Sequence, residues 1–264
     1  MTDIQSILDQ LDREYPDRGF VCASPAERWE DGTIVGNGSQ GALCFGRPHD
    51  EEIVLSHESL FLPIYPPGKF IHLAPHWDRI RDLVLENRGG EAMSFTMDLA
   101  RESGYPERTL TDPFIGACSL EITMPESECT AYARSVDFET GDSVTAWKAA
   151  VGLFPRRVFA SRAAGVVAVR IASPNGTHFD ASLELARIER DLDAEFYDTA
   201  VAETRRTTDE SLLSFRVRFT EFAEGQALRG YSVAMRVVPE GGRVQVDGDV
   251  LGVVDARALL LLID

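Results

Sequence analysis

From Cys118 onward the chain repeatedly alternates apolar and polar residues, a pattern typical of β-strands. The clearest stretch contains four alternating apolar side chains, Leu213, Phe215, Val217 and Phe219. Successive side chains of a strand point to opposite faces of its sheet, so this spacing predicts a half-buried strand with one face in solvent. The alternation recurs with weaker contrast over residues 231–237. Residues 166–171 are more continuously apolar, which predicts a strand near the centre of its sheet.

Short turns separate these segments, as at residues 174–176 and 247–248. About a dozen consecutive strands with short connections favour antiparallel pairing over a parallel α/β sheet. We therefore predict a mainly β fold, a large two-sheet antiparallel β-sandwich of the super-sandwich kind. Between residues 190 and 210 the apolar content falls and the charge rises, and this predicts a long exposed connection.

A short helical insert is predicted around residues 75–102. Its first helix begins near Pro75 and ends at Gly89-Gly90. The apolar residues of this helix recur at helical spacing and are Trp77, Ile80, Leu83 and Val84. A second helix is predicted over roughly residues 91–102. Another amphipathic helix is predicted near the N-terminus, where Ile4, Ile7, Leu8 and Leu11 share one face.

The composition excludes several classes of partner. A net charge of −17 over 264 residues argues against nucleic acid and against an anionic membrane surface. The longest apolar runs are too short to span a bilayer. The sequence after Met1 lacks a secretory signal, so we expect a cytoplasmic protein if Met1 is the native start.

The cysteines and histidines predict neither disulfides nor a metal site. Four widely spaced cysteines, Cys22, Cys44, Cys118 and Cys129, form no C-x-x-C pair, and we expect reduced structural thiols. His72 and His76 have helical spacing, but Pro75 lies between them and no third ligand is evident. We expect no metal and no cofactor.

The stretch from Arg28 to Gly46 is a glycine-rich loop that turns into a short apolar strand at residues 42–45. Within it, residues 36–38 (Gly-Asn-Gly) predict a tight turn, because glycine adopts backbone angles closed to other residues and asparagine tolerates left-handed ones. This loop, the apolar strand and residues 55–61 together resemble the start of the N-terminal domain of glycoside hydrolase family 95. That family contains α-L-fucosidases, with related α-L-galactosidases. Ser56, His57 and Phe61 depart from the family pattern.

Further matches to that family follow in order along the chain. Residues 132–137 resemble its tyrosine-x-arginine-x-leucine-aspartate segment, and residues 156–161 and 255–260 resemble two later segments. Residues 112–118 replace the turn that is usual in the family. The similarity thus extends from about Arg28 to the last residue.

The resemblance implies one non-catalytic N-terminal β-sandwich domain over residues 1–264, from a longer inverting glycoside hydrolase. Its implied partners are its own C-terminal (α/α)6-barrel, for which this chain has no room, and a carbohydrate, an α-L-fucoside or α-L-galactoside. The family places its general acid and its water-activating residues in the barrel, so no catalytic residue is carried over. We expect this chain alone to be inactive.

Five residues beside the glycine-shaped loops are candidates for a substrate-site rim: Trp29, Glu30, Asn37, His57 and Glu58. Each also has a structural explanation. Glu30 fits a solvated turn, which we favour, and Trp29 fits either a sugar-stacking ring or a buried anchor. Asn37 fits a residue that holds its turn, and His57 fits a strand-end histidine bonded to a carbonyl.

Three alternatives to the scaffold hypothesis remain open. An independent carbohydrate-binding module predicts a row of exposed aromatic residues on one sheet face, but the aromatic residues mostly fall at apolar alternation positions. The N-terminal domain of a family 65-type phosphorylase or hydrolase would also be a large sandwich joined to a barrel. A stand-alone sandwich that oligomerises through its sheet edges is the third.

Overall fold

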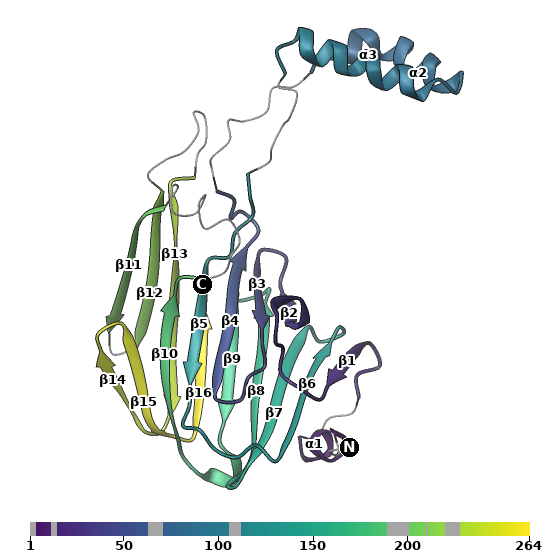
Figure 1. The fold of residues 1–264 in the computed structure, drawn as a ribbon. Helices are drawn as coiled ribbons and strands as arrows, with labels where there is room; N and C mark the ends of the chain where they lie inside the picture. Colours follow the sequence, from purple (N-terminus) through teal and green to yellow (C-terminus); the bar gives the residue numbers. More distant parts are fainter. Residues whose placement is uncertain are drawn as a thin grey trace.

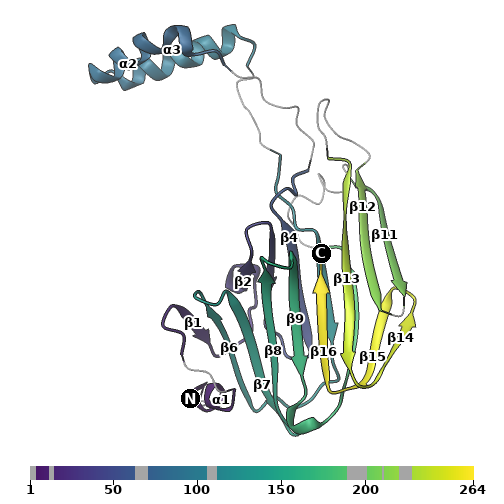
Figure 2. The same cartoon turned by 180° about the vertical axis from the view of Figure 1, so that it is seen from behind.

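The computed structural model describes residues 4–11, 15–62, 71–105, 112–188, 201–209, 211–219 and 228–264, with only the backbone described for 201–209. Two antiparallel sheets stack face to face, as the views from opposite sides show (Figures 1 and 2). The predicted mainly β sandwich is therefore confirmed.

The larger sheet has nine strands. In spatial order they are β1 (Gly19–Cys22), β6 (Ala131–Asp137), β7 (Asp142–Ala149), β8 (Gly152–Ser161), β9 (Val166–Ala172), β16 (Ala258–Ile263), β13 (Gly230–Glu240), β12 (Leu212–Phe219) and β11 (Val201–Asp209). The smaller sheet has seven strands. They are β14 (Arg243–Asp247), β15 (Val250–Ala256), β10 (Phe179–Ala186), β5 (Cys118–Thr123), β4 (Asp50–His57), β3 (Gln40–Cys44) and β2 (Thr33–Gly36).

The core lies between the sheets and follows the sequence alternation. The four alternating apolar residues of β12, Leu213 to Phe219, are each at most 3% exposed, whereas Arg216 and Arg218 between them are exposed. β9 lies in the middle of the larger sheet between β8 and β16, as its continuous apolar sequence predicted. All four cysteines are free; Cys44 and Cys118 are buried, whereas Cys22 is half-buried and Cys129 is exposed.

The predicted exposed connection at residues 190–210 is wrong in part. Residues 201–209 form β11, which pairs with β12 at the edge of the larger sheet, while residues 189–200 lie outside the described part of the chain. An edge strand has one unpaired side, and charged residues there discourage pairing with other molecules. The charge that predicted a loop is therefore compatible with an edge strand.

The predicted helical insert is confirmed as an antiparallel helical hairpin, formed by α2 (Trp77–Leu85) and α3 (Gly89–Glu102), after a 3₁₀ turn at Ala74–His76. Gly89 and Gly90 do not end a helix but begin α3. The chain reverses instead at Asn87, whose φ of 61° is the left-handed conformation that ends helices. Figures 1 and 2 show the hairpin standing clear of both sheets.

The predicted N-terminal helix is α1 (Ile4–Gln10). Its buried Ile7 packs with Ala133 and Ala146 in a small cluster separate from the main core. No helix in the described residues is long and apolar enough to cross a membrane.

Candidate functional site

The turn between β2 and β3 is held by the side chain of Asn37. Its Oδ1 accepts hydrogen bonds from the backbone N–H of Ser39 and of Gln40, at 2.9 and 2.8 Å. Its Nδ2 donates to the carbonyl of Ser161 at the end of β8 and to Oε1 of Gln40, at 3.1 and 3.2 Å. An asparagine amide has two donor hydrogens and two acceptor lone pairs, so these four bonds use its full capacity. The geometry favours a structural role, since Asn37 has no bond left for a ligand.

Because the bond to Ser161 joins the smaller sheet to the larger one, Asn37→Ala is expected to lower the free energy of unfolding by about 2 kcal/mol. Asn37→Asp keeps both acceptor bonds and loses the two donors, so a loss of about 1 kcal/mol is expected. Urea titrations of the three proteins measure both values. An Asn37→Ala protein as stable as the wild type would contradict this role.

His57 and Glu58 lie beside the same turn because His57 pairs with Gln40 across β4 and β3. Nδ1 of His57 accepts a hydrogen bond from the backbone N–H of Ser59 at 3.2 Å, so the other ring nitrogen carries the proton in the neutral form. The expected bond from this histidine to a carbonyl is therefore replaced by one from an amide. Glu58 accepts from the hydroxyl of Ser39 at 3.3 Å.

Trp29 and Glu30 lie away from this cluster. They belong to a short 3₁₀ helix, Trp29–Asp31, at the opposite end of β2 from the Asn37 turn. The four residues of β2 separate the two places by roughly 10 Å. Trp29 is 51% exposed, so its interpretation as a buried anchor is wrong. Glu30 is exposed, as the solvated turn requires.

The Asn37 turn and the end of β4 meet Asp264, the residue that follows β16. Nε2 of Gln40 donates to Oδ1 of Asp264 at 3.0 Å, a contact between residues 224 positions apart. We call this end of the sandwich the Asp264 end. The sequence did not single out Gln40 or Asp264, because no local pattern reports that the last strand ends beside this turn.

A pocket of about 340 Å³ opens at the Asp264 end, near the small end of the range for ligand sites. Its polar lining residues are Gln40, Ser56, His57, Ser59, Ser232 and Asp264. Its apolar lining includes Leu55, Leu60, Val167, Val233 and Ile263. Amide, hydroxyl and imidazole groups around an apolar floor can bind the hydroxyls and C–H groups of a sugar, or hold an apolar side chain with a polar edge.

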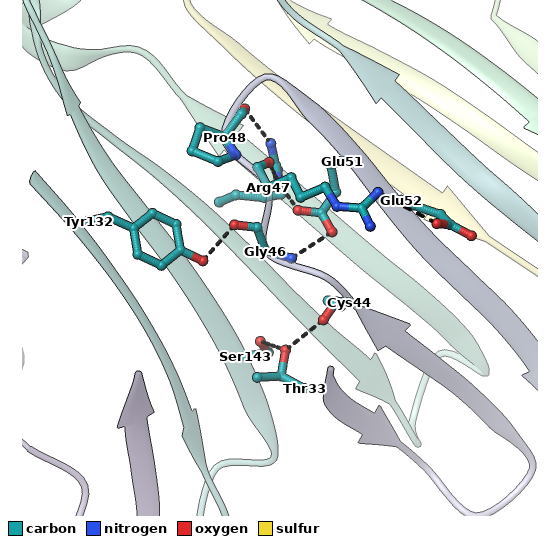
Figure 3. A network of polar contacts seen from close by, with 10 residues as sticks. Thr33, Cys44, Gly46, Arg47, Pro48, Glu51, Glu52, Tyr132 and Ser143 are labelled. Carbon is teal, nitrogen blue, oxygen red and sulfur yellow. Dashed lines mark hydrogen bonds and ion pairs between the residues drawn. The ribbon is translucent and has the colours of Figure 1, made fainter. Parts of the chain in front are cut away.

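A second group of polar residues is buried between the sheets, around Glu51 and Arg156 (Figure 3). One oxygen of Glu51 accepts from the backbone N–H of Gly46 at 2.9 Å, and the other accepts from Nη1 of Arg156. The guanidinium also donates to the carbonyls of Arg47 and Pro48, at 2.9 and 3.0 Å. Both charged side chains are at most 1% exposed.

Burial raises the pKa of the Glu51 carboxyl, and the positive charge of Arg156 together with the N–H of Gly46 opposes that rise. Burial also raises the pKa of the Cys44 thiol. A buried thiol with a raised pKa forms little thiolate, so Cys44 is not a nucleophile.

The segments that carry the family resemblance converge on this buried network. Tyr132 donates its hydroxyl to the carbonyl of Gly46 at 2.6 Å, and Figure 3 shows Gly46 between Tyr132 and Glu51. Nε of Arg134, also buried, donates to the carbonyl of Ser24 at 2.9 Å. Gly46, Tyr132 with Arg134, and Arg156 lie on three of the matched segments, and the bonds of Tyr132 and Arg156 join the two sheets. Some positions that match the family are therefore core residues. Because these residues are buried, they cannot contact a substrate.

Sequence reasoning missed Glu51 and Arg156. A signal for the arginine was present, because Phe154, Arg156 and Val158 occupy one phase of the alternation in β8. A charged residue on the apolar phase of a strand indicates either a functional group or a buried ion pair. The partner could not be identified, since it comes from the other sheet.

Comparison with known proteins places the chain in a family. The sequence model for "Glycosyl hydrolase family 65, N-terminal domain" matches residues 21–264. "Alpha-L-fucosidase 2" of Arabidopsis thaliana is 25% identical over 185 residues, which cover 68% of this chain and 21% of that protein. The chain thus spans about a fifth of the length of this curated relative.

Among solved structures, a putative kojibiose phosphorylase from the human microbiome has 10% sequence identity and a TM-score of 0.47, covering 92% of this chain and 32% of that one. The expected class, an N-terminal domain of a glycoside hydrolase, is confirmed by the family match, and membership of family 95 in particular stays a prediction. The chain belongs to the glycosyl hydrolase family 65 N-terminal domain family.

Proposed function

We propose that this chain is the non-catalytic β-sandwich of an α-L-fucosidase-like glycoside hydrolase. In this proposal its Asp264 end faces the sugar site of a C-terminal catalytic barrel. The observation that carries the proposal is a pocket with a polar rim lined by His57 and Asp264, with Glu58 next to it on the Asn37 turn through its bond to Ser39. Similarity to a plant fucosidase over 68% of the chain supports the choice of sugar.

Two features of the site fit a supporting role. Loops on a rigid sandwich are typical carriers of binding residues, and here the turn at Asn37 is fixed to both sheets. The most buried ionisable pair, Glu51 with Arg156, is closed to solvent and cannot receive a substrate. In the proposal the catalytic carboxyl groups belong to the barrel.

A family 65-type phosphorylase or hydrolase is the second candidate, and the family match favours it. An independent carbohydrate-binding module has less support. Exposed aromatic residues such as Trp29, Phe61, Phe114 and Phe138 lie in loops or short turns of the described chain, and not in a row on one sheet face. A role in the cytoplasm, without nucleic-acid or membrane partners, stays a prediction.

The test compares this chain with the protein encoded by the complete gene. The longer protein is expected to hydrolyse an aryl α-L-fucoside or α-L-galactoside, and the 264-residue chain is expected to be inactive. Cleavage of α-linked glucose disaccharides only when inorganic phosphate is present would support the phosphorylase candidate instead. Activity of the short chain would overturn the scaffold proposal.

The rim itself is tested in the longer protein. Glu58→Ala and His57→Ala are expected to lower kcat/KM by about 5- to 50-fold, mainly through a higher KM, if these side chains bind sugar hydroxyls. Glu30→Ala, at the other end of β2, removes an exposed carboxylate and serves as the matched control. Equal kinetics for all three variants and the wild type would remove the rim role.

A further inference from the structure

On one flank of the helical hairpin, side chains of the hairpin pack against one another. Phe95 of α3 lies edge-on against His76, with ring centroids 5.7 Å apart, and the guanidinium of Arg79 lies 4.0 Å from the centre of the Phe95 ring. Ala92 and Ala100 are buried where α3 meets α2. The two helices therefore form a defined packed unit.

The other flank exposes large apolar side chains. Trp77 and Val84 of α2 are 61% and 56% exposed, and Met93 and Met97 of α3 are 71% and 42% exposed. At 100° per residue, Trp77 and Val84 lie about 140–160° around α2 from Arg79. Met93 and Met97 lie about 160° around α3 from Phe95. Since Arg79 and Phe95 touch, the four apolar side chains share the opposite flank, which we call the apolar flank.

The remaining surface of the hairpin carries charged, solvent-exposed side chains. Arg81 pairs with Asp78, Arg88 with Glu91, and Arg101 with Asp98, at 2.7–2.8 Å. Scattered exposed apolar residues need no explanation, but a stripe on each of two adjacent helices marks a contact surface. Methionine adapts its shape to a partner, which suits an interface between domains.

The part of the chain that carries the hairpin leaves and rejoins the sandwich at the Asp264 end. The chain leaves the sandwich after Leu62 and returns at Pro113, where the N–H of Leu62 donates to the Pro113 carbonyl at 3.0 Å. Leu60 and Ala117, which lie close to Leu62 and Pro113 in sequence, line the same pocket as Asp264. A polypeptide that continues from Asp264 would therefore begin beside the place where the chain leaves the sandwich for the hairpin and returns from it.

We propose that the apolar flank packs against the domain that follows Asp264 in the complete protein. This inference rests on the proposed function, in which the chain is an N-terminal domain. The family description names the domain as N-terminal, and the chain spans about a fifth of its plant relative, so a large neighbouring domain is the occupant that the observations favour. A second copy of this chain and a return of the hairpin to its own sandwich are outcomes that the test separates.

Methionine oxidation measures the contact directly. The rates at Met93 and Met97, followed by mass spectrometry under dilute peroxide, are compared between the 264-residue chain and the protein from the complete gene. We expect both rates to fall at least tenfold in the longer protein. Met124 and Met235, which are 6% and 0% exposed, should oxidise slowly in both and serve as internal controls.

A pair of variants in the longer protein locates the contact. Met93→Lys is expected to raise the oxidation rate at Met97 at least fivefold. Glu102→Lys, nine residues later and thus on the opposite side of α3, should leave it unchanged. Equal rates in the short and long proteins would overturn the proposal.

Slow oxidation already present in the short chain would also overturn the proposal. A slow rate that depends on protein concentration would indicate that a second copy of the chain covers the apolar flank. A slow rate that does not depend on concentration would indicate that the hairpin packs on its own sandwich. Glycosidase activity of the longer protein is measured separately. Slow oxidation of Met93 in an inactive longer protein would contradict the proposed function but support this contact. Fast oxidation of Met93 in an active longer protein would contradict only this contact.

Discussion

Arg156→Met is expected to lower the free energy of unfolding by about 3–5 kcal/mol, because it leaves the carboxylate of Glu51 buried without a cation. Equilibrium denaturation in urea measures the loss. Arg170→Met, on the neighbouring strand β9 with its side chain exposed, should cost less than about 0.5 kcal/mol. An Arg156→Met protein as stable as the Arg170→Met control would contradict the importance of the pair.

The loss in Arg156→Met should depend on pH with a defined sign. Burial raises the pKa of Glu51 above its usual value near 4.5, and the variant removes the largest opposing influence, so this pKa rises further. A carboxyl whose pKa is higher in the folded state gains a proton on folding, and stability then falls as the pH rises from the unfolded pKa through the folded one. The deficit relative to the wild type should therefore be larger at pH 8 than at pH 5.

The double variant Arg156→Met with Glu51→Gln separates charge from packing. It removes the buried carboxylate, so it should recover much of the stability at pH 8 and lose the pH dependence of the deficit. A deficit in Arg156→Met that is equal at both pH values would show that lost packing, and not the unpaired charge, causes the effect.

Gly46→Ala is expected to lower the free energy of unfolding by about 3 kcal/mol. Gly46 has a φ of 74°, and an added Cβ would lie 2.7 Å from the hydroxyl of Tyr132 and 3.0 Å from Cδ of Arg134. Gly141→Ala is the matched control, since Gly141 has a φ of 69° but nothing lies within 4 Å of the added Cβ. That control should cost about 1 kcal/mol, the cost of the left-handed backbone alone. Equal losses of unfolding free energy in the two variants would mean that Tyr132 and Arg134 can move away from the added Cβ without destabilising the protein.

Local sequence patterns predicted the helices and strands of this fold better than they predicted which of these elements pair with one another. The alternation in β12 and the helical spacing in α2 are both regular spacings of apolar residues within a single segment. Both predictions are confirmed. β11 was missed because its outer edge faces solvent, so its composition resembles that of a loop. The reversal at Asn87 was placed at Gly89-Gly90 because glycine is the commoner left-handed residue.

The candidate site was predictable only in part. His57, Glu58 and Asn37 were selected because they adjoin glycine-shaped turns, and the structure brings these three together. Trp29 was selected by the same reasoning but lies at the other end of β2, since a strand carries its two flanking loops to opposite ends of the sandwich. Asp264 was missed, because its contact with Gln40 depends on the complete topology.

The position of β16 in the larger sheet has a consequence for the order of folding. This strand is the last in the described chain, yet it lies between β9 and β13 and pairs with both. Until it is present, the larger sheet consists of two separate parts, each with an open edge that can pair with other chains. During synthesis from the N-terminus, assembly of the core must wait for residues 258–263, and contacts this distant in sequence form slowly. The half-made domain is therefore more exposed to aggregation than the finished one, and the arrival of β16 closes the two open edges at β9 and β13.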